Sequence, residues 1–321
     1  MNGPALVLST LLVFLGGQLA GGQSPPLGQM TVTLLGTGTP LPRVEHMGPS
    51  TLIEAGGQAL LFDVGRGTVI RLVQARVPAE NIRAIFLTHL HSDHISGLPD
   101  FWLTSWLPSL GGRRTPLRVF GPKGTRAMTD GFKAAFAEDI RMRTLEERLP
   151  ASGADFAPSE FDADATVFEE GGVRVESFAV DHGGELRPAH GFRVTYGGRS
   201  VVISGDTRYS ENLILRAAGA DVIVHEVIAA GAEAKALPGA QFRLSHHTSP
   251  ADAARVFQRV KPRLAVFTHL ALIPDRQGRV PTAEEIVTEA SREYKGRIEV
   301  GEDLMRIVVS DSIEVQRPRS Q

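Results

Sequence analysis

The sequence predicts an α/β protein in which two β-sheets are sandwiched between helices. Short β-rich apolar runs recur along the chain, and each ends at a glycine or a turn. The runs come in two sets, each followed by helical segments, which indicates two sheets and not a single doubly wound sheet. The composition is that of an ordinary globular protein, because 42% of the 321 residues are hydrophobic and 22% are charged.

The N-terminal set begins with an apolar strand and a hairpin. Two strands flank Gly56-Gly57, a pair that is typical of a hairpin turn. A helix follows and is closed by Pro78, and a later helix places Met128 and Phe132 on one face. The strands expected in this set cover residues 30–35, 50–54, 59–62, 84–88 and 117–120, and the helices cover residues 68–76 and 125–137.

The C-terminal set repeats this arrangement with apolar strands and two amphipathic helices. Its strands are rich in β-branched and aromatic residues, and its helices carry apolar residues at helical spacing. The expected strands cover residues 173–180, 191–196, 201–204, 222–224 and 264–268, and the helices cover residues 250–260 and 282–294.

The N-terminal segment predicts export. The first 42 residues carry no charged side chain, and residues 5–15 form a largely apolar run that is shorter than a membrane span of about 20 residues. Small residues follow it around Ala20, so we expect residues 1–22 to be a signal peptide and the protein to be periplasmic or secreted. The alternatives are that this segment forms a buried first helix, or that the protein is cytoplasmic and its first residue has been assigned upstream of the true start of the domain.

Charge and cysteine content narrow the chemistry. The net charge of −2 provides no overall basic field for nucleic acid, and the absence of cysteine excludes disulfides, thiolate metal sites and thiol nucleophiles. Any metal chemistry must therefore use the ten histidines and the carboxylates. Residues 138–172 hold ten acids and three arginines, and we expect an acidic, loop-rich insertion there, either a solvated excursion or a lid over the site.

The strongest chemical signal is the segment His89-Leu90-His91-Ser92-Asp93-His94, directly after an apolar strand. Histidines buried for packing alone do not cluster in this way, because each would need its own partner. His89 and His91 point the same way, while Asp93 and His94 turn toward a second point, so the segment can serve two adjacent metal ions. Imidazole and carboxylate without thiolate suit zinc, with manganese or iron as alternatives.

Metal-competent side chains also follow three further apolar strands. These are Asp181-His182, Asp206 and His269. Strand ends can converge at one edge of a sheet, so we expect these residues to meet the histidine cluster.

These motifs resemble those of a known family. The HLHSDH segment fits the HxHxDH signature of the metallo-β-lactamase superfamily, and the chain looks most like the branch of ribonuclease Z and the alkylsulfatase and arylsulfatase-type enzymes. Residues 62–68 (FDVGRGT), 204–208 (SGDTR), 225–226 (HE) and 247–249 (HTS) are similar to motifs of that branch. The resemblance implies a four-layer αββα sandwich, with residues 30–315 forming one domain of two pseudo-symmetric halves.

The resemblance also implies roles for individual residues. One zinc ion would be held by His89, His91 and His182, the other by Asp93, His94 and His269, and both by a bridging Asp206. A hydroxide between the ions would attack the substrate. Asp93 is a catalytic candidate as well as a ligand. The other catalytic candidates are His247, which would act as a general acid, and Glu226, which would orient His247.

The remaining candidates receive supporting or structural roles. Asp63 is expected to hold a ligand histidine. Arg208 would meet an anionic substrate or form a structural ion pair. The histidines expected to be structural are His46, His190, His225 and His246.

The substrate expected from these observations is a small phosphodiester or sulfate ester. Ribonuclease Z enzymes hold tRNA with an arm that would follow residues 191–196, but here Gly197-Gly198 leads directly into the next strand. We therefore rank tRNA 3′ processing as an alternative, beside a β-lactamase-type amide hydrolase, and a non-catalytic metal-binding protein last. We expect no nucleic-acid partner and no membrane contact beyond the leader, and we leave a homodimer open.

Overall fold

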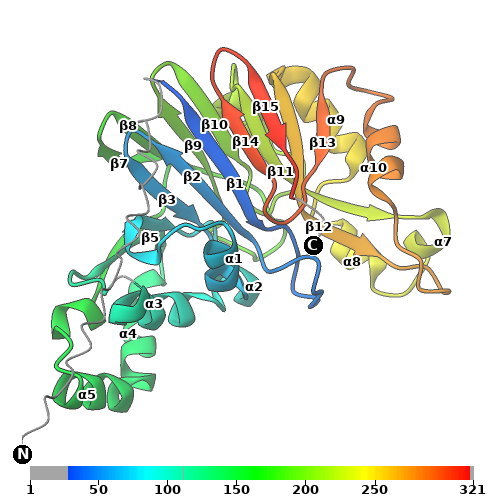
Figure 1. Ribbon diagram of the computed structural model, residues 1–321. Coiled ribbons are helices and arrows are strands. Elements are labelled where there is room, and N and C mark those ends of the chain that lie inside the picture. Colours follow the sequence, from blue (N-terminus) through cyan, green and yellow to red (C-terminus); the bar gives the residue numbers. More distant parts are fainter. Residues whose placement is uncertain (1–27, 111, 319–321) are drawn as a thin grey trace, which may run out of the picture.

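Two β-sheets pack face to face in the computed structural model, with helices on both outer faces (Figure 1). The structure describes residues 28–110 and 112–318. The predicted α/β sandwich with two central sheets is therefore confirmed. The signal peptide expected at residues 1–22 lies outside the described residues, and the homodimer stays a prediction.

Sheet A is built mainly from the N-terminal half of the chain. It is antiparallel from β15 to β3 and parallel from β3 to β6. Its strands, from edge to edge, are β15 (Ile313–Gln316), β14 (Arg306–Val309), β1 (Met30–Gly36), β2 (Ser50–Ala55), β3 (Gln58–Phe62), β4 (Ile82–Phe86), β5 (Leu117–Pro122) and β6 (Phe156–Phe161).

Sheet B repeats this mixed pattern with strands from the C-terminal half. It is parallel from β13 to β10 and antiparallel from β10 to β7. Its strands, from edge to edge, are β13 (Ile298–Val300), β12 (Leu264–Ile273), β11 (Val222–Ala230), β10 (Arg199–Ile203), β9 (His190–Tyr196), β8 (Val173–Ala179) and β7 (Ala165–Glu170).

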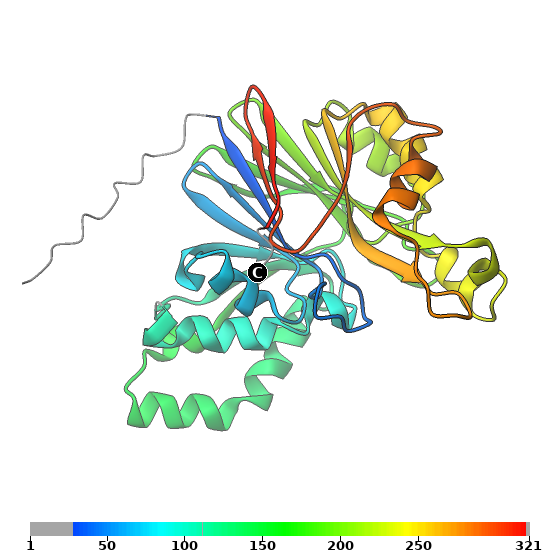
Figure 2. The same cartoon turned by 45° about the vertical axis from the view of Figure 1, so that its right-hand side comes forward.

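The helices form the two outer layers. In Figures 1 and 2, α3, α4 and α5 lie beside sheet A, whereas α9 and α10 lie on the far side of sheet B. The helices are α1 (Thr68–Gln74), α2 (Ser92–Ile95), α3 (Leu98–Trp106), α4 (Thr125–Ala135), α5 (Ala137–Glu146), α6 (Glu211–Ala217), α7 (Ala232–Lys235), α8 (Ala240–Leu244), α9 (Pro250–Val260) and α10 (Ala283–Ala290).

The period-two alternation of the strands separates the core into layers. On β11, Val222 and Val224 pack between the two sheets, while Ile223 packs against the helices that cover sheet B. On β4, Phe86 faces the other sheet and Ile85 faces the helices of sheet A. Successive side chains of a strand point to opposite faces, so every central strand contributes to two cores.

Two strands of sheet B run further than predicted. β11 and β12 continue to Ala230 and Ile273, beyond the polar residues at which we expected them to end. Both extensions are buried beneath α7 and α8, where Ile228 and Ile273 contact Ala234 and Ala240. This packing between residues distant in sequence stabilises the pairing of β11 with β12 beyond His225-Glu226 and His269.

The segment at residues 138–172 corrects a prediction, because it is mostly regular and not rich in loops. It contributes α5, the edge strand β6 of sheet A and the edge strand β7 of sheet B. Phe161 and Phe168 pack into the core between the sheets, which anchors both strands. Several of its acids pair with basic side chains, as Asp155 does with Lys133.

No helix in the described part of the chain is both long enough and apolar enough to cross a membrane.

Asp303 joins three segments near the end of sheet A. Its carboxylate accepts hydrogen bonds from the backbone N–H groups of Thr37 (2.9 Å) and Met47 (2.7 Å), and it forms a buried ion pair with Arg71 of α1 at 2.9 Å. The loop between β1 and β2 therefore depends on one carboxylate that lies between β13 and β14.

We expect Asp303→Ala to lower the free energy of unfolding by about 3 kcal/mol, because it leaves Arg71 without its buried partner and removes the acceptor of two N–H groups. Urea unfolding followed by circular dichroism measures the loss. The matched control is Asp311→Ala, since the Asp311 side chain is fully exposed in its pair with Arg199. Equal losses in the two variants would contradict this role of Asp303.

Candidate metal centre

The histidine segment forms a tight loop and the short helix α2 after β4. The backbone N–H of Val64 donates to the carbonyl of His94 at 2.8 Å, and that of Gly97 donates to the carbonyl of Val64 at 2.9 Å. These bonds hold α2 against the loop that follows β3. Asp93 and His94 lie on α2, and both are buried.

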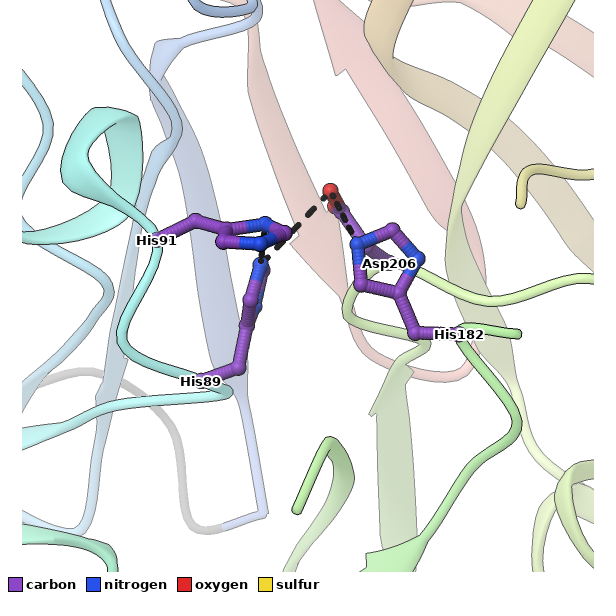
Figure 3. A group of neighbouring side chains, drawn as sticks. All are labelled: His89, His91, His182 and Asp206. Carbon is purple, nitrogen blue, oxygen red and sulfur yellow. Dashed lines mark hydrogen bonds and ion pairs between the residues drawn. The ribbon is translucent and has the colours of Figure 1, made fainter. Parts of the chain in front are cut away.

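One group of candidate ligands combines both halves of the chain (Figure 3). His89 and His91 approach from the loop after β4, with Nε2 of His89 2.9 Å from Nδ1 of His91. His182 and Asp206 approach from the opposite side, and Nε2 of His182 lies 3.7 Å from Oδ2 of Asp206. One ligand atom from each of these four residues lies within 4.8 Å of the other three, as the coordination of one ion requires.

The second group consists of Asp93, His94 and His269, all buried. Nε2 of His269 lies 3.3 Å from Oδ2 of Asp93 and also 3.3 Å from Oδ2 of Asp206. Nε2 of His94 lies 3.4 Å from Oδ2 of Asp206. Asp206 therefore contacts both groups, as the bridging role implied by the resemblance requires.

Unusual backbone conformations bring these side chains together. Ala265 and Phe267 face the helices, and strict alternation would place His269 on that face as well. A bulge in the β11–β12 ladder falls at His269, whose φ of 43° turns it toward the cluster. His269 thus lies at a bulge within β12, and not after the strand as predicted.

Asp63 and His246 orient the ligand rings from behind. The Asp63 carboxylate accepts from the backbone N–H of Thr88 at 2.8 Å and lies 2.8 Å from Nδ1 of His94. The carbonyl of His246 lies 2.9 Å from Nδ1 of His182. Both contacts leave the Nε2 atom of the ligand ring facing the centre of the cluster, as partners of metal-binding histidines do.

The electrostatics of the cluster match a bound cation. Burial lowers the pKa values of His89, His91 and His182, so these rings are neutral near pH 7 and can offer lone pairs. Burial alone would raise the pKa of Asp206, but the charges of His269 and His94 hold it well below its usual value. Burial alone would also lower the pKa of His94, but the charges of Asp206 and Asp63 raise it well above its usual value. The cluster therefore combines the three neutral imidazoles of His89, His91 and His182 with an ionised Asp206 and a positively charged His94.

The donor set also leaves polar atoms without partners. The Nε2 atoms of His94 and His182 are buried and have no hydrogen-bond partner among the described residues. A buried polar atom without a partner costs free energy, which coordination of a cation would offset. Nitrogen and oxygen donors without sulfur suit zinc, manganese or iron, so the residues fit the metals that the sequence led us to expect.

His247 and Glu226 form a pair beside the cluster. Glu226 is buried, and its Oε1 atom accepts from the backbone N–H of Thr248 at 2.8 Å. Its Oε2 atom lies 3.3 Å from Nδ1 of His247. Burial alone would lower the pKa of His247, but the Glu226 carboxylate raises it to about 9.

Three of the histidines expected to be structural lie outside both ligand groups. His225 packs on Phe257 of α9, and Nδ1 of His46 lies 2.8 Å from Oγ1 of Thr37. His190 is buried against Phe161. Arg208 pairs with Asp181 at 2.9 Å, the ion pair that we named as one of its two roles.

The sequence motifs did not reveal the apolar residues that form one wall of the site. A cavity of about 300 Å³ opens beside the ligands, and apolar side chains from distant segments line it. His246, expected to be structural only, also lines it. These residues carry no motif, so only their convergence in the fold identifies them. The apolar lining residues are Pro40, Leu41, Leu186, Ile228, Phe242, Ala271, Leu272 and Ile273.

Comparisons with known proteins agree with this geometry. Residues 59–270 match the model of the Beta-lactamase superfamily domain. The chain is 36% identical over 284 residues to a protein named Ribonuclease Z from Mycobacterium bovis, an alignment that covers 87% of this chain and 98% of the relative. A Ribonuclease Z from Mycobacterium marinum is 37% identical over 282 residues, with the same coverage of both chains.

Solved structures show the same fold. The metallo-beta-lactamase fold protein YhfI from Bacillus subtilis has a TM-score of 0.67 and 20% identity, covering 88% of this chain and all of that one. The short form of human tRNase Z has a TM-score of 0.61 and 23% identity, covering 87% and 98%. A diphosphatase of the PhnP family has a TM-score of 0.59 and 17% identity, covering 88% and 97%.

We expect Asp206→Ala and the isosteric Asp206→Asn to lower the metal content of the purified protein to less than half, because each removes the carboxylate shared by both groups. Elemental analysis of the purified protein measures the ions, and circular dichroism checks the fold. Asp130→Asn, which changes an exposed acid on α4, is the matched control. An unchanged metal content in a folded Asp206 variant would contradict the bridging role.

Proposed function

This chain belongs to the metallo-β-lactamase superfamily, in the branch that includes ribonuclease Z, and from this premise we propose that it hydrolyses phosphodiester bonds in RNA. It is a hydrolase of that superfamily. The observation that carries the proposal is identity of 36% over 98% of a relative named Ribonuclease Z, together with the convergence of all seven expected ligand residues. We extend the proposal to two divalent ions, with zinc as the first choice. They would bind at the seven candidate ligand residues around Asp206, which we call the Asp206 cluster.

The proposal changes the order of the alternatives that the sequence suggested. The acidic charge of residues 138–172 is an argument against a polyanion such as RNA. Glu170 of that segment pairs with Arg83 and Arg118, and no residue of the segment is among those that line the cavity beside the ligands. The acidic segment is therefore a weak barrier to RNA. None of the relatives reported above is named for sulfate esters, so we do not propose that substrate.

Different residues of the chain have different roles in the proposed hydrolysis. When bound, two such ions lower the pKa of a shared water and neutralise charge on the phosphate. Asp63 and the carbonyl of His246 keep His94 and His182 in their ligand orientation. Glu226 holds His247 at the edge of the same cavity, where His247 donates a proton to the leaving oxygen.

A second candidate is hydrolysis of small phosphodiesters. Tyr196 pairs directly with Arg199 across the Gly197-Gly198 turn, so the tRNA-binding arm that the resemblance leads us to expect is missing at this position. The cavity of about 300 Å³ is near the lower end of the range for ligand pockets. Both features favour a substrate of about one nucleotide.

We expect the metal-loaded protein to cleave a precursor tRNA at its 3′ end, and also to hydrolyse bis-p-nitrophenyl phosphate. The same panel should include p-nitrophenyl sulfate, a cyclic nucleotide and a chromogenic β-lactam. Turnover of the small phosphodiesters without the tRNA would favour the second candidate. Two bound ions without hydrolysis of any phosphodiester would refute the proposal, and the Asp206→Ala variant controls for contaminating nucleases.

We expect His247→Ala to slow hydrolysis most for substrates whose leaving group needs a proton. For an alkoxide leaving group the loss should be about 100-fold or more, whereas for p-nitrophenolate it should be much smaller. Thymidine 5′-phosphate esters of methanol and p-nitrophenol allow a direct comparison of kcat, with elemental analysis to verify that both ions remain. Equal losses for the two esters would reject the acid role.

A further inference from the structure

The cavity beside the metal centre has two chemically different sides. Candidate ligands form one side, among them His91, Asp93 and Asp206. Most of the other lining residues are apolar, and they come from the loop after β1, the loop after β8, the ends of β11 and β12 and helix α8. Ion coordination and proton transfer do not require this apolar side, so it calls for a separate explanation.

Phe242 is the largest apolar side chain of this wall, and it is 69% exposed. Its ring lies against the ring of His246, with centroids 4.3 Å apart and planes at 44°. The carbonyl of Phe242 lies 2.5 Å from Nδ1 of the same imidazole. The phenyl ring thus contacts one imidazole, lines the cavity and remains largely exposed, although exposure of an aromatic ring to water is unfavourable.

The helix that carries Phe242 is anchored to the sheet by apolar packing. Ile228 and Ile273 of the sheet pack against Ala234 of α7 and Ala240 of α8. In both views of the ribbon, α7 and α8 lie against the ends of β11 and β12 (Figures 1 and 2). Arg243 follows Phe242 in the sequence and also lines the cavity, so the same helix contributes a cation to the lining.

We propose that this wall binds one nucleobase of the substrate, stacked on Phe242, while the adjoining phosphate lies at the Asp206 cluster. The proposal rests on the proposed function, because it assumes a nucleotide phosphodiester. Every nucleobase has a flat π face, so an aromatic platform accepts any base. A cavity of about 300 Å³ accommodates one nucleoside unit next to the ions.

The direct test compares two ligands that differ only in the base. Adenosine 5′-monophosphate should bind the metal-loaded protein about tenfold or more tightly than ribose 5-phosphate in calorimetric titration. Phe242→Ala should bring the two affinities together, whereas Phe242→Tyr should preserve the difference. Equal affinities for the two ligands in the unchanged protein would overturn the proposal, as would a difference that survives Phe242→Ala.

Hydrolysis provides a second readout. Phe242→Ala should raise KM about tenfold for the p-nitrophenyl ester of thymidine 5′-phosphate and leave kcat nearly unchanged, with no effect on methyl p-nitrophenyl phosphate. Leu215→Ala is the matched control, because Leu215 is 70% exposed on α6 and does not line the cavity. Equal effects of Phe242→Ala on both esters would argue against base stacking.

The two readouts separate this proposal from the proposed function. If the unchanged protein hydrolyses no phosphodiester, the proposed function fails, and the titrations still decide whether Phe242 binds a base. If hydrolysis occurs but the base makes no difference to binding or KM, the wall proposal fails alone.

Discussion

The burial of the Asp206 carboxylate is the constraint on which the site depends. A buried carboxylate needs compensating charge, and Asp206 is 3% exposed while four histidines surround it within 4 Å. Those histidines come from the loop after β4, the loop after β8 and the bulge in β12. The two sheets must therefore pack in one register for the charge to be compensated, and the same arrangement leaves the donors that a cation would use.

The sheets provide this convergence through ordinary alternation, and the exceptions to alternation lie at the site. Val222 and Val224 fill the space between the sheets, and Glu226 continues on the same face toward His247. Asp63 and His269 adopt positive φ angles, and such conformations are unfavourable for residues other than glycine. The surrounding core compensates for this strain, which explains how functional side chains depart from the regular pattern without loss of the fold.

The residues that line the cavity include candidate metal ligands, which would take part in the reaction, and an apolar wall, which would bind the substrate. Ligand residues are shared across a superfamily of varied hydrolases, so they say little about what is bound beside them. The wall formed by α8 and the strand ends carries no motif, and its aromatic ring lines the same cavity as the candidate metal ligands. The proposed RNA substrate rests on relatives named Ribonuclease Z, whereas the cavity volume and the short Gly197-Gly198 turn favour a smaller substrate.

The sequence by itself determined the sandwich of two sheets, because the apolar runs and the turns that end them are local patterns. The His89–His94 spacing and the polar residues after further strands are also local, and the resemblance to the metallo-β-lactamase superfamily implied seven candidate ligands among them. Only the tertiary structure shows the bulge at His269, the segments that Asp303 joins and the apolar wall that includes Phe242. Asp303 contacts residues more than 230 positions away, and the length of β11 and β12 depends on cover from α7 and α8. Such contacts leave no periodic trace in the chain, since they depend on which distant surfaces meet once both sheets have packed.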